Sequence, residues 1–222
     1  LQGSGSLDDI AKPRQISEDE LITFDGVAID VRQASEYGAG HVPNSVNIGL
    51  GGQFASWAGT LIPIGTPIAI IAETQDQVDE AVTRLARVGH ENATYFFLIS
   101  DYSGDIRKVG QVSVDLVDQL IRDGGKIQFV DVRRASEHAA SHAPQTTNIP
   151  LDKLAVDFET LDPTAPTYVI CQGGYRSSIG TSILENAGFR ELLNVTGGTA
   201  AWLAAGLETQ VSTAVCAATK QV

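Results

Sequence analysis

The chain has 222 residues, of which 43% are hydrophobic and 19% are charged, and its formal net charge is −12. This composition is typical of a soluble globular protein and excludes a disordered chain. No apolar run approaches the roughly 18 residues that a membrane-spanning helix needs. The acidic balance disfavours nucleic acid and anionic membrane surfaces, so we expect neither as a partner.

The start of the chain and its cysteine content narrow the class further. The first ten residues lack the basic and apolar segments of a secretory signal, which together with a free thiol predicts a cytoplasmic protein. Because the sequence contains no Met, we expect a fragment or a processed product. Its two cysteines, Cys171 and Cys216, cannot form a disulfide framework or a four-cysteine zinc site. We therefore expect no metal and no cofactor.

Sequence patterns in the first half predict alternating strands and helices. A helix is expected to begin at Ser17, where a hydroxyl precedes three acidic residues. Farther along the chain, apolar runs predict strands over residues 27–31, 67–72 and 94–98, a small strand ending at residue 48, and an amphipathic helix over 77–89.

The second half repeats the first. Residues 29–48 and 130–149 are identical at 11 of 20 positions. A period near 100 residues is the size of a domain and is too long for a solenoid repeat of roughly 20–50 residues. The same reasoning predicts a helix that begins at Ser113, strands over 128–132, 167–171 and 192–195, and an amphipathic helix over 176–188. The chain is therefore predicted to be α/β, with two tandem domains that each contain a mostly parallel sheet flanked by helices.

The segment after the predicted strand 167–171 has the features of a nucleophilic cysteine site. Cys171 ends the strand, and Arg176 opens the next helix. Gly173 and Gly174 allow positive φ, so that successive N–H groups can converge on one point. These N–H groups, the helix N-terminus and Arg176 favour a thiolate at Cys171. A buried packing cysteine, the commoner role of a lone cysteine, would require none of these neighbours.

The sequence CQGGYR at 171–176 resembles the active loop of the rhodanese (sulfurtransferase) family, a Cys and an Arg separated by four residues. Segments 131–144 and 197–202 are similar to two further signatures of that family, and the resemblance covers nearly the whole chain as two tandem domains. It implies that Cys171 accepts sulfane sulfur as a persulfide and passes it to sulfite, cyanide or a thiol. It also implies that a loop holds the persulfide and the anionic substrate, formed by Gln172, Gly173, Gly174, Tyr175, Arg176 and Ser177.

The first domain departs from this pattern. Alignment of the two helices at an offset of 99 places Ala72 where the second domain has Cys171, and Gln77 where it has Arg176. The loop has no glycine pair and several acidic residues, so we predict that it is catalytically inactive. The predicted divisions are 1–14 as a linker or remnant, 15–104 as the inactive domain, 105–210 as the catalytic domain and 211–222 as a C-terminal tail.

A glycine-rich stretch at residues 47–59 is unusual for a rhodanese. It is similar to the corresponding stretch in proteins that fuse a metallo-β-lactamase-fold persulfide dioxygenase to two rhodanese domains. The resemblance implies a dioxygenase domain as a partner in the same polypeptide and a role in sulfide oxidation. It also implies small anionic donors and acceptors: thiosulfate, sulfite and low-molecular-weight persulfides.

The repeat also serves as an internal control on residue roles. Side chains that the inactive half keeps are expected to maintain the fold, among them the pairs Asp30/Asp131, Arg32/Arg133, Glu36/Glu137 and His41/His142. A pairing of Glu137 with an active-site Arg is the alternative for that residue. Ser177 and Ser178 are expected either to donate near the persulfide or to cap the helix. Trp202 is expected in the core, and Tyr175 and Gln172 are expected to shape access.

Three alternatives follow from the same residues. A phosphatase of related fold would have five residues between Cys and Arg, and the count of four favours sulfur. A thiol reductase would pair Cys171 with Cys216, and Cys216→Ser would then abolish its activity. A binding or scaffold module without catalysis would be insensitive to Cys171→Ser.

Overall fold

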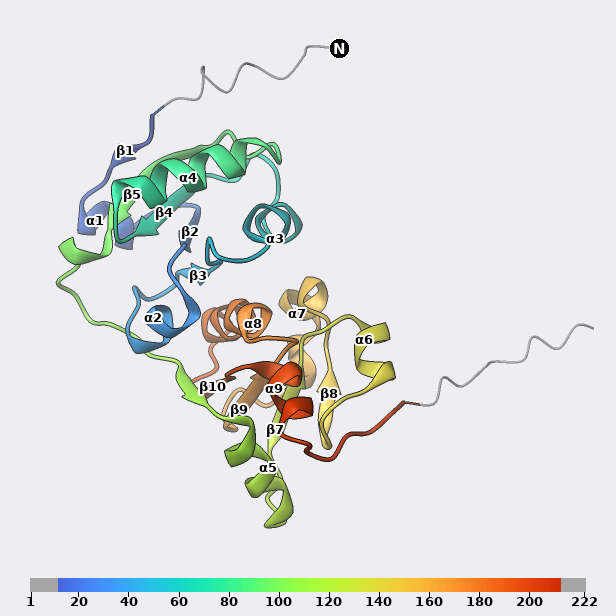
Figure 1. Ribbon diagram of the computed structural model, residues 1–222. Coiled ribbons are helices and arrows are strands. Elements are labelled where there is room, and N and C mark those ends of the chain that lie inside the picture. Colours follow the sequence, from blue (N-terminus) through green and yellow to red (C-terminus); the bar gives the residue numbers. More distant parts are fainter. Residues whose placement is uncertain (1–11, 213–222) are drawn as a thin grey trace, which may run out of the picture.

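The computed structural model describes residues 12–212 and contains two five-stranded sheets, one in each half of the chain (Figure 1). Residues 1–11 of the expected linker 1–14, and Cys216 in the expected tail, lie outside the described residues, whereas Arg14 belongs to a strand of the first domain. No helix within residues 12–212 has the length and apolar character needed to cross a membrane.

The first sheet has the strand order β1-β5-β4-β2-β3, and all of its neighbours are parallel. Its strands are β1 (Arg14–Gln15), β2 (Val27–Asp30), β3 (Val46–Asn47), β4 (Ile68–Ala72) and β5 (Ala93–Leu98). The helices of this domain are α1 (Glu18–Ile22), α2 (Ala34–Ala39), α3 (Phe54–Leu61) and α4 (Gln75–Ala86), followed by the short 3-10 helix Ile99–Asp101.

The second sheet repeats this order as β6-β10-β9-β7-β8, again with parallel neighbours. Its strands are β6 (Gly110–Val112), β7 (Gln128–Asp131), β8 (Thr146–Asn148), β9 (Thr167–Ile170) and β10 (Leu192–Val195). Its helices are α5 (Val114–Arg122), α6 (Ala135–Ala140), α7 (Leu151–Asp157), the 3-10 helix Phe158–Thr160, α8 (Tyr175–Asn186) and α9 (Gly198–Ala204). The predicted fold class, two tandem parallel α/β domains, is confirmed.

Local chemistry accounts for the helix starts. Ser17 caps α1 in a capping box, since its hydroxyl accepts from the N–H of Glu20 while the Glu20 carboxylate accepts from the N–H of Ser17. Ser113 caps α5 in the same position of the second domain. Gly174, at φ +97°, precedes α8 in the left-handed region that favours glycine.

The expectation that residues 176–188 form an amphipathic helix is wrong. The helix α8 is buried on nearly all sides, including its small polar residues Ser177, Ser178, Thr181 and Ser182. One side packs on β9 and β10, and the other lies against α2 and β3 of the first domain (Figure 1). A helix placed between two domains has no solvent face, so its sequence shows no polar stripe.

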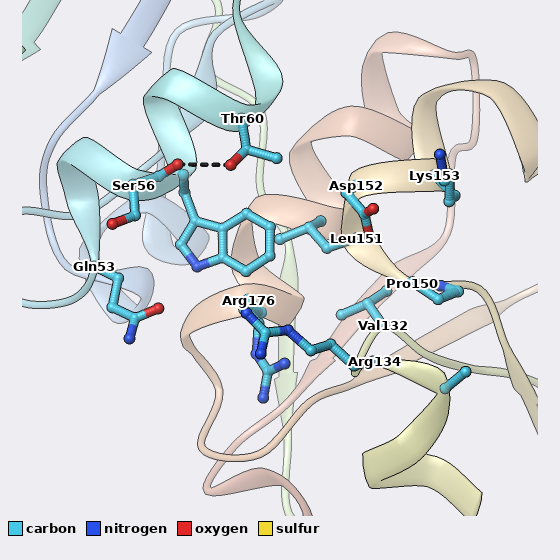
Figure 2. Close-up of a pocket in the computed structure, with 12 residues that line it drawn as sticks. Gln53, Ser56, Thr60, Val132, Arg134, Pro150, Leu151, Asp152, Lys153 and Arg176 are labelled. Atoms are coloured by element: carbon cyan, nitrogen blue, oxygen red, sulfur yellow. Dashed lines mark hydrogen bonds between the residues drawn. The ribbon is translucent and has the colours of Figure 1, made fainter. Parts of the chain in front are cut away.

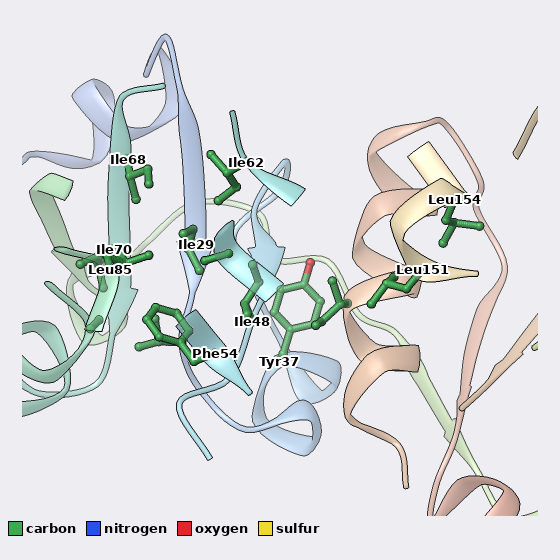
Figure 3. Close-up of a cluster of buried hydrophobic side chains, with 14 of the residues drawn as sticks. Ile29, Tyr37, Ile48, Phe54, Ile62, Ile68, Ile70, Leu85, Leu151 and Leu154 are labelled. Carbon is green, nitrogen blue, oxygen red and sulfur yellow. The ribbon is translucent and has the colours of Figure 1, made fainter. Parts of the chain in front are cut away.

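Buried aliphatic and aromatic side chains join the two domains. In the first domain Ile29, Ile48 and Phe54 pack between the sheet and the helices. Figure 3 shows Tyr37 on the side of this cluster that faces the second domain, from which Leu151 comes toward it. All these side chains belong to one continuous cluster, so the hydrophobic core continues across the domain boundary.

Polar contacts fix the same boundary. The buried His41 ring lies 2.8 Å from the Glu185 carboxylate through Nε2 and 2.9 Å from the Tyr37 carbonyl through Nδ1. The Asn47 N–H donates to the Ser182 hydroxyl at 3.1 Å, and the Ser178 hydroxyl donates to the Asn47 side chain. These contacts hold α8, and therefore the cysteine loop at its start, against the first domain.

Candidate active site

Cys171 directly follows β9, at the carboxyl end of the second sheet. Asp131 pairs with Ile170 as Asp30 pairs with Ile71, so Cys171 occupies the place that Ala72 has in the first domain. Only 1% of Cys171 is exposed. The N–H of Gly174 donates to its Sγ at 3.1 Å, and the Ser177 hydroxyl donates at 3.4 Å. The loop therefore folds back over the sulfur.

Several N–H groups around the sulfur have no backbone acceptor. The first N–H groups of a helix have no partner within that helix. At the start of α8, the N–H groups of Tyr175, Arg176 and Ser177 donate to no carbonyl within residues 12–212, and neither do those of Gln172 and Gly173. A run of unused N–H donors at a helix N-terminus favours an anion.

Arg176 forms an ion pair with Glu137. Its two terminal nitrogens each donate to a different carboxylate oxygen at 2.8 Å. Hydrogen bonds from Arg176 hold the pKa of Glu137 down at about 2, and Glu137 in turn raises the pKa of Arg176. Glu137 also accepts the N–H of Arg134 at the start of α6, as Glu36 accepts that of Gln33 at the start of α2. Glu137 thus has both the structural role and the pairing role.

The start of α9 supports the loop from behind. Thr199 and Ala200 donate their N–H groups to the carbonyls of Cys171 and Gln172 at 2.8 and 3.0 Å. Gly198 has φ +57°, and a Cβ added there would lie 2.3 Å from the Cys171 carbonyl oxygen. Only glycine fits at that point. Gly198 was not predicted as a functional residue, although the glycine pair before Trp202 was the available signal. Trp202 is fully buried, as expected.

Tyr175 connects the loop to the first domain. Its hydroxyl donates to the Gly49 carbonyl at 2.8 Å, and burial raises its pKa. A Cβ on Gly52 would lie 2.4 Å from the Tyr175 ring. Arg84 holds this glycine-rich stretch by donating to the carbonyls of Leu50 and Gly52. The unusual glycines of the first domain therefore form the surface on which Tyr175 packs. The sequence did not predict this contact.

A cavity of about 430 Å³ opens in front of Cys171 between the two domains. Five of the predicted site residues line it: Cys171, Gln172, Gly173, Tyr175 and Arg176. Gly174 and Ser177 contact the sulfur. The sequence left two roles possible for Ser178, donation near the persulfide or capping of the helix. Its hydroxyl instead donates to the Asn47 side chain of the first domain. The first domain contributes Gly52, Gln53 and Trp57 to the cavity wall.

Comparisons with known proteins identify the family of both domains. A model of the rhodanese-like domain matches residues 14–104 and again residues 113–205. The chain belongs to the rhodanese-like domain family. The geometry around Cys171 therefore occurs in the second of two rhodanese-like domains.

Individual relatives are distant. YrkF of Bacillus subtilis is 25% identical over 45% of this chain and 54% of its own length. The thiosulfate sulfurtransferase GlpE of Pseudomonas savastanoi is 29% identical over 39% of this chain and 80% of its own length. The crystal structure of thiosulfate sulfurtransferase from Pseudomonas aeruginosa is 21% identical, with a TM-score of 0.43, over 91% of this chain and 44% of that chain. The chain thus spans about half the length of the first of these relatives.

In the corresponding loop of the first rhodanese-like domain, side chains of the loop accept two of its backbone N–H groups. Gln77 stands where the second domain has Arg176, and its side chain accepts from the N–H of Glu73 at 2.8 Å. Thr74 accepts the N–H of Gln77 and caps α4. Ala72 is fully buried and has no nucleophilic atom. This loop offers neither a thiol nor a cation to an anionic substrate.

Proposed function

We propose that the second domain is a sulfurtransferase in which Cys171 carries sulfane sulfur as a persulfide. The observation that carries the proposal is the position of its Sγ, under the N–H of Gly174 and inside a loop whose other N–H groups have no backbone acceptor. Such a loop stabilises a negative charge at and just beyond the sulfur.

The proposed reaction has two half-reactions. The Cys171 thiolate attacks the outer sulfur of thiosulfate, the S–S bond of thiosulfate breaks, and sulfite leaves with its electron pair. A new S–S bond leaves Cys171 as a persulfide anion. An acceptor thiolate, cyanide or sulfite then attacks the terminal sulfur and restores the Cys171 thiolate. Charge and atoms balance in both steps, and no outside oxidant or reductant takes part.

The proposed roles of the neighbours follow from the chemistry of this loop. The N–H groups of Gln172–Ser177 hold the persulfide and the anionic group of the substrate. Arg176, oriented by Glu137, places its guanidinium in the wall of the cavity. Ser177 donates to the sulfur and limits how it can turn. Tyr175 and Gln172 shape the access of the acceptor.

The physiological setting is also a proposal. One relative is named a thiosulfate sulfurtransferase, which supports thiosulfate as a donor. The glycine-rich stretch over residues 47–59 supports a chain that is fused to a metallo-β-lactamase-fold persulfide dioxygenase. Sulfite and low-molecular-weight persulfides would then be substrates in a cytoplasmic sulfide oxidation system. In this scheme residues 15–104 are the inactive domain and residues 105–210 the catalytic domain.

A turnover assay tests the proposal. The wild-type chain should transfer sulfur from thiosulfate to cyanide, and Cys171→Ser should show none of this activity while its circular dichroism spectrum stays unchanged. Cys216→Ser should keep full activity, which separates a sulfurtransferase from a reductase. Equal activity in the wild type and Cys171→Ser would contradict the proposal and favour a binding or scaffold module.

A further inference from the structure

We propose that the inactive first domain provides one wall of a binding groove for an organic thiol or persulfide that carries a carboxylate or phosphate away from its sulfur. This inference rests on the proposed function, because it names the substrate class that reaches Cys171. It also gives the first domain a role in recognition that does not require chemistry there.

The groove lies between α3 of the first domain and α7 of the second. Figure 2 shows Thr60 of α3 on one side of this space and Leu151 and Lys153 of α7 on the other. Its volume is about 410 Å³. The groove shares four lining residues with the cavity in front of Cys171: Gln53, Trp57, Arg134 and Arg176. The two spaces therefore adjoin, and a bound molecule can have its sulfur at Cys171 and its remainder between the domains.

The size of this space indicates a larger substrate than thiosulfate. Each of the two spaces alone falls in the range of roughly 300–1,000 Å³ that drug-sized ligands occupy. A small inorganic anion with its sulfur at Cys171 needs only the cavity in front of Cys171. The groove between α3 and α7 is then left for an organic substituent on the sulfur, which thiosulfate, sulfite and cyanide do not have.

The charges of the groove indicate an anionic substituent. Arg134 and Lys153 are exposed, and neither forms an ion pair with a carboxylate of residues 12–212. The Arg176 charge is balanced by Glu137, and Asp152 is the acidic residue that lines the groove. Arg134 and Arg176 line both the groove and the cavity in front of Cys171, whereas Lys153 lines only the groove. Two unpaired cations against one carboxylate favour an anion.

Apolar surface lies between these cations. Trp57 packs partly on the core and leaves part of its side chain in the groove, opposite Leu151, Val132 and Pro150. An aliphatic or planar segment of a ligand can pack against this surface while its anionic groups reach the cations. Peptide thiols with free carboxylates and nucleotide thiols with phosphates both have this arrangement of groups.

The groove leaves the chemistry at Cys171 unchanged. An organic persulfide anion transfers its terminal sulfur to the Cys171 thiolate: its S–S bond breaks, a new S–S bond forms at Cys171, and the organic thiolate leaves. The reverse step makes the organic thiol an acceptor. Charge and atoms balance in either direction without an added oxidant or reductant.

Kinetics with a charge-reversal variant test the groove. Lys153 lines the groove but not the cavity in front of Cys171. With Lys153→Glu, the ratio of kcat/KM for glutathione persulfide to kcat/KM for thiosulfate should fall about tenfold. Lys126→Glu, which makes the same charge change at an exposed site outside the groove, should leave that ratio unchanged. Thr60→Trp, which fills the groove, should lower the ratio as well.

A binding experiment separates this inference from the proposed function. Isothermal titration calorimetry on Cys171→Ser with S-methylglutathione and with S-methyl-coenzyme A needs no sulfur transfer. Binding of either probe that Lys153→Glu weakens supports the groove, and the tighter probe shows whether carboxylate or phosphate is recognised. Failure of both probes to bind, or equal ratios in Lys153→Glu and Lys126→Glu, would overturn the inference. A wild-type chain that transfers sulfur from no donor would instead overturn the proposed function.

Discussion

Each domain has a buried pair of an aspartate and an arginine that supports the carboxyl end of its sheet. The two domains differ in the loops that follow β4 and β9. In the first domain Asp30 holds Arg32 through paired hydrogen bonds, and Arg32 donates to the Gly40 carbonyl. In the second domain Asp131 and Arg133 repeat this arrangement, with the Ser141 carbonyl as acceptor. All four charged residues are buried. The support is therefore present both with and without a cysteine in the neighbouring loop.

The side-chain amide of an asparagine completes this support in each domain. Asn47 donates to the carbonyls of Asp30 and Arg32, and Asn148 does the same for the corresponding carbonyls in the second domain. The loops that follow β4 and β9 differ, because only the second has a cysteine, a glycine pair and an arginine. Residues kept by both copies therefore fix the end of the sheet, whereas the residues specific to the second copy create the proposed sulfur site.

The largest effect of a change outside the loop itself is expected from Gly198→Ala. An added Cβ would collide with the Cys171 carbonyl, so the loop must move. A displacement of about 1 Å at a reacting group can cost about 10²-fold in rate, and we expect kcat/KM for thiosulfate to fall by about that factor. Gly206→Ala is the matched control, since Gly206 also has positive φ but has no atom within 4 Å of the added Cβ. Equal losses in the two variants would show that backbone strain, and not loop displacement, is responsible.

A second variant pair compares Glu137 with its counterpart Glu36. Because the pKa of Glu137 is lowered to about 2 from an ordinary 4.5, its ion pair stabilises the fold fully above pH 4.5. That stabilisation is lost as the pH falls from 4.5 through 2. Glu137→Gln should therefore lower the free energy of unfolding by about 1–2 kcal/mol at pH 7, and by less at pH 3. Urea titrations at both pH values measure this difference. Glu36→Gln, which removes no arginine partner, should cost less, and an equal cost would contradict the role of Arg176.

A smaller effect is expected at the contact between the domains. Tyr175→Phe removes the hydrogen bond to the Gly49 carbonyl and should lower the free energy of unfolding by about 1 kcal/mol. Tyr168→Phe serves as its control, because the Tyr168 hydroxyl forms no hydrogen bond with residues 12–212. Thermal unfolding that is identical in the two variants would show that this bond does not contribute to the domain contact.

No sulfur transfer is expected from introducing a thiol alone into the first domain. In a Cys171→Ser background, Ala72→Cys should leave sulfur transfer at the level of Cys171→Ser. The first loop has Gln77 in place of an arginine, and its own side chains accept two of its N–H groups. Transfer of sulfur by this double variant would show that the cysteine is sufficient and that the surrounding loop is not needed.

The sequence predicts the central strands of both sheets because a buried strand has a recognisable run of apolar residues. All five residues of β4 are buried, and an apolar run of this kind marks a central strand. The short helices α2, α3, α6, α7 and α9 and the edge strands β1 and β6 were not predicted. β1 has two exposed residues, and β6 has three residues of which one is buried, which is too little pattern for a prediction. Their position at the sheet edge comes from pairing with β5 and β10.

The candidate site shows the same division. Cys171 and its loop follow from residue types at fixed spacing, and the structure brings these residues together. The roles of Gly198, Gly52 and Trp57 do not follow from spacing, because each depends on a segment that is distant in the sequence. A single sequence does not specify which surfaces of two domains meet. The packing surface of Tyr175 and the groove are therefore known only from the structure.

The central claim is that sulfur resides on Cys171 and nowhere in the first domain. Intact-protein mass spectrometry after incubation with thiosulfate tests this most directly. We expect the wild-type chain to gain the mass of one sulfur atom and Cys171→Ser to gain none, with the added mass on the peptide that contains residue 171. Addition of sulfite should remove it. A wild-type chain that gains no mass with thiosulfate and none with glutathione persulfide, or a Cys171→Ser chain that still gains it, would contradict the account.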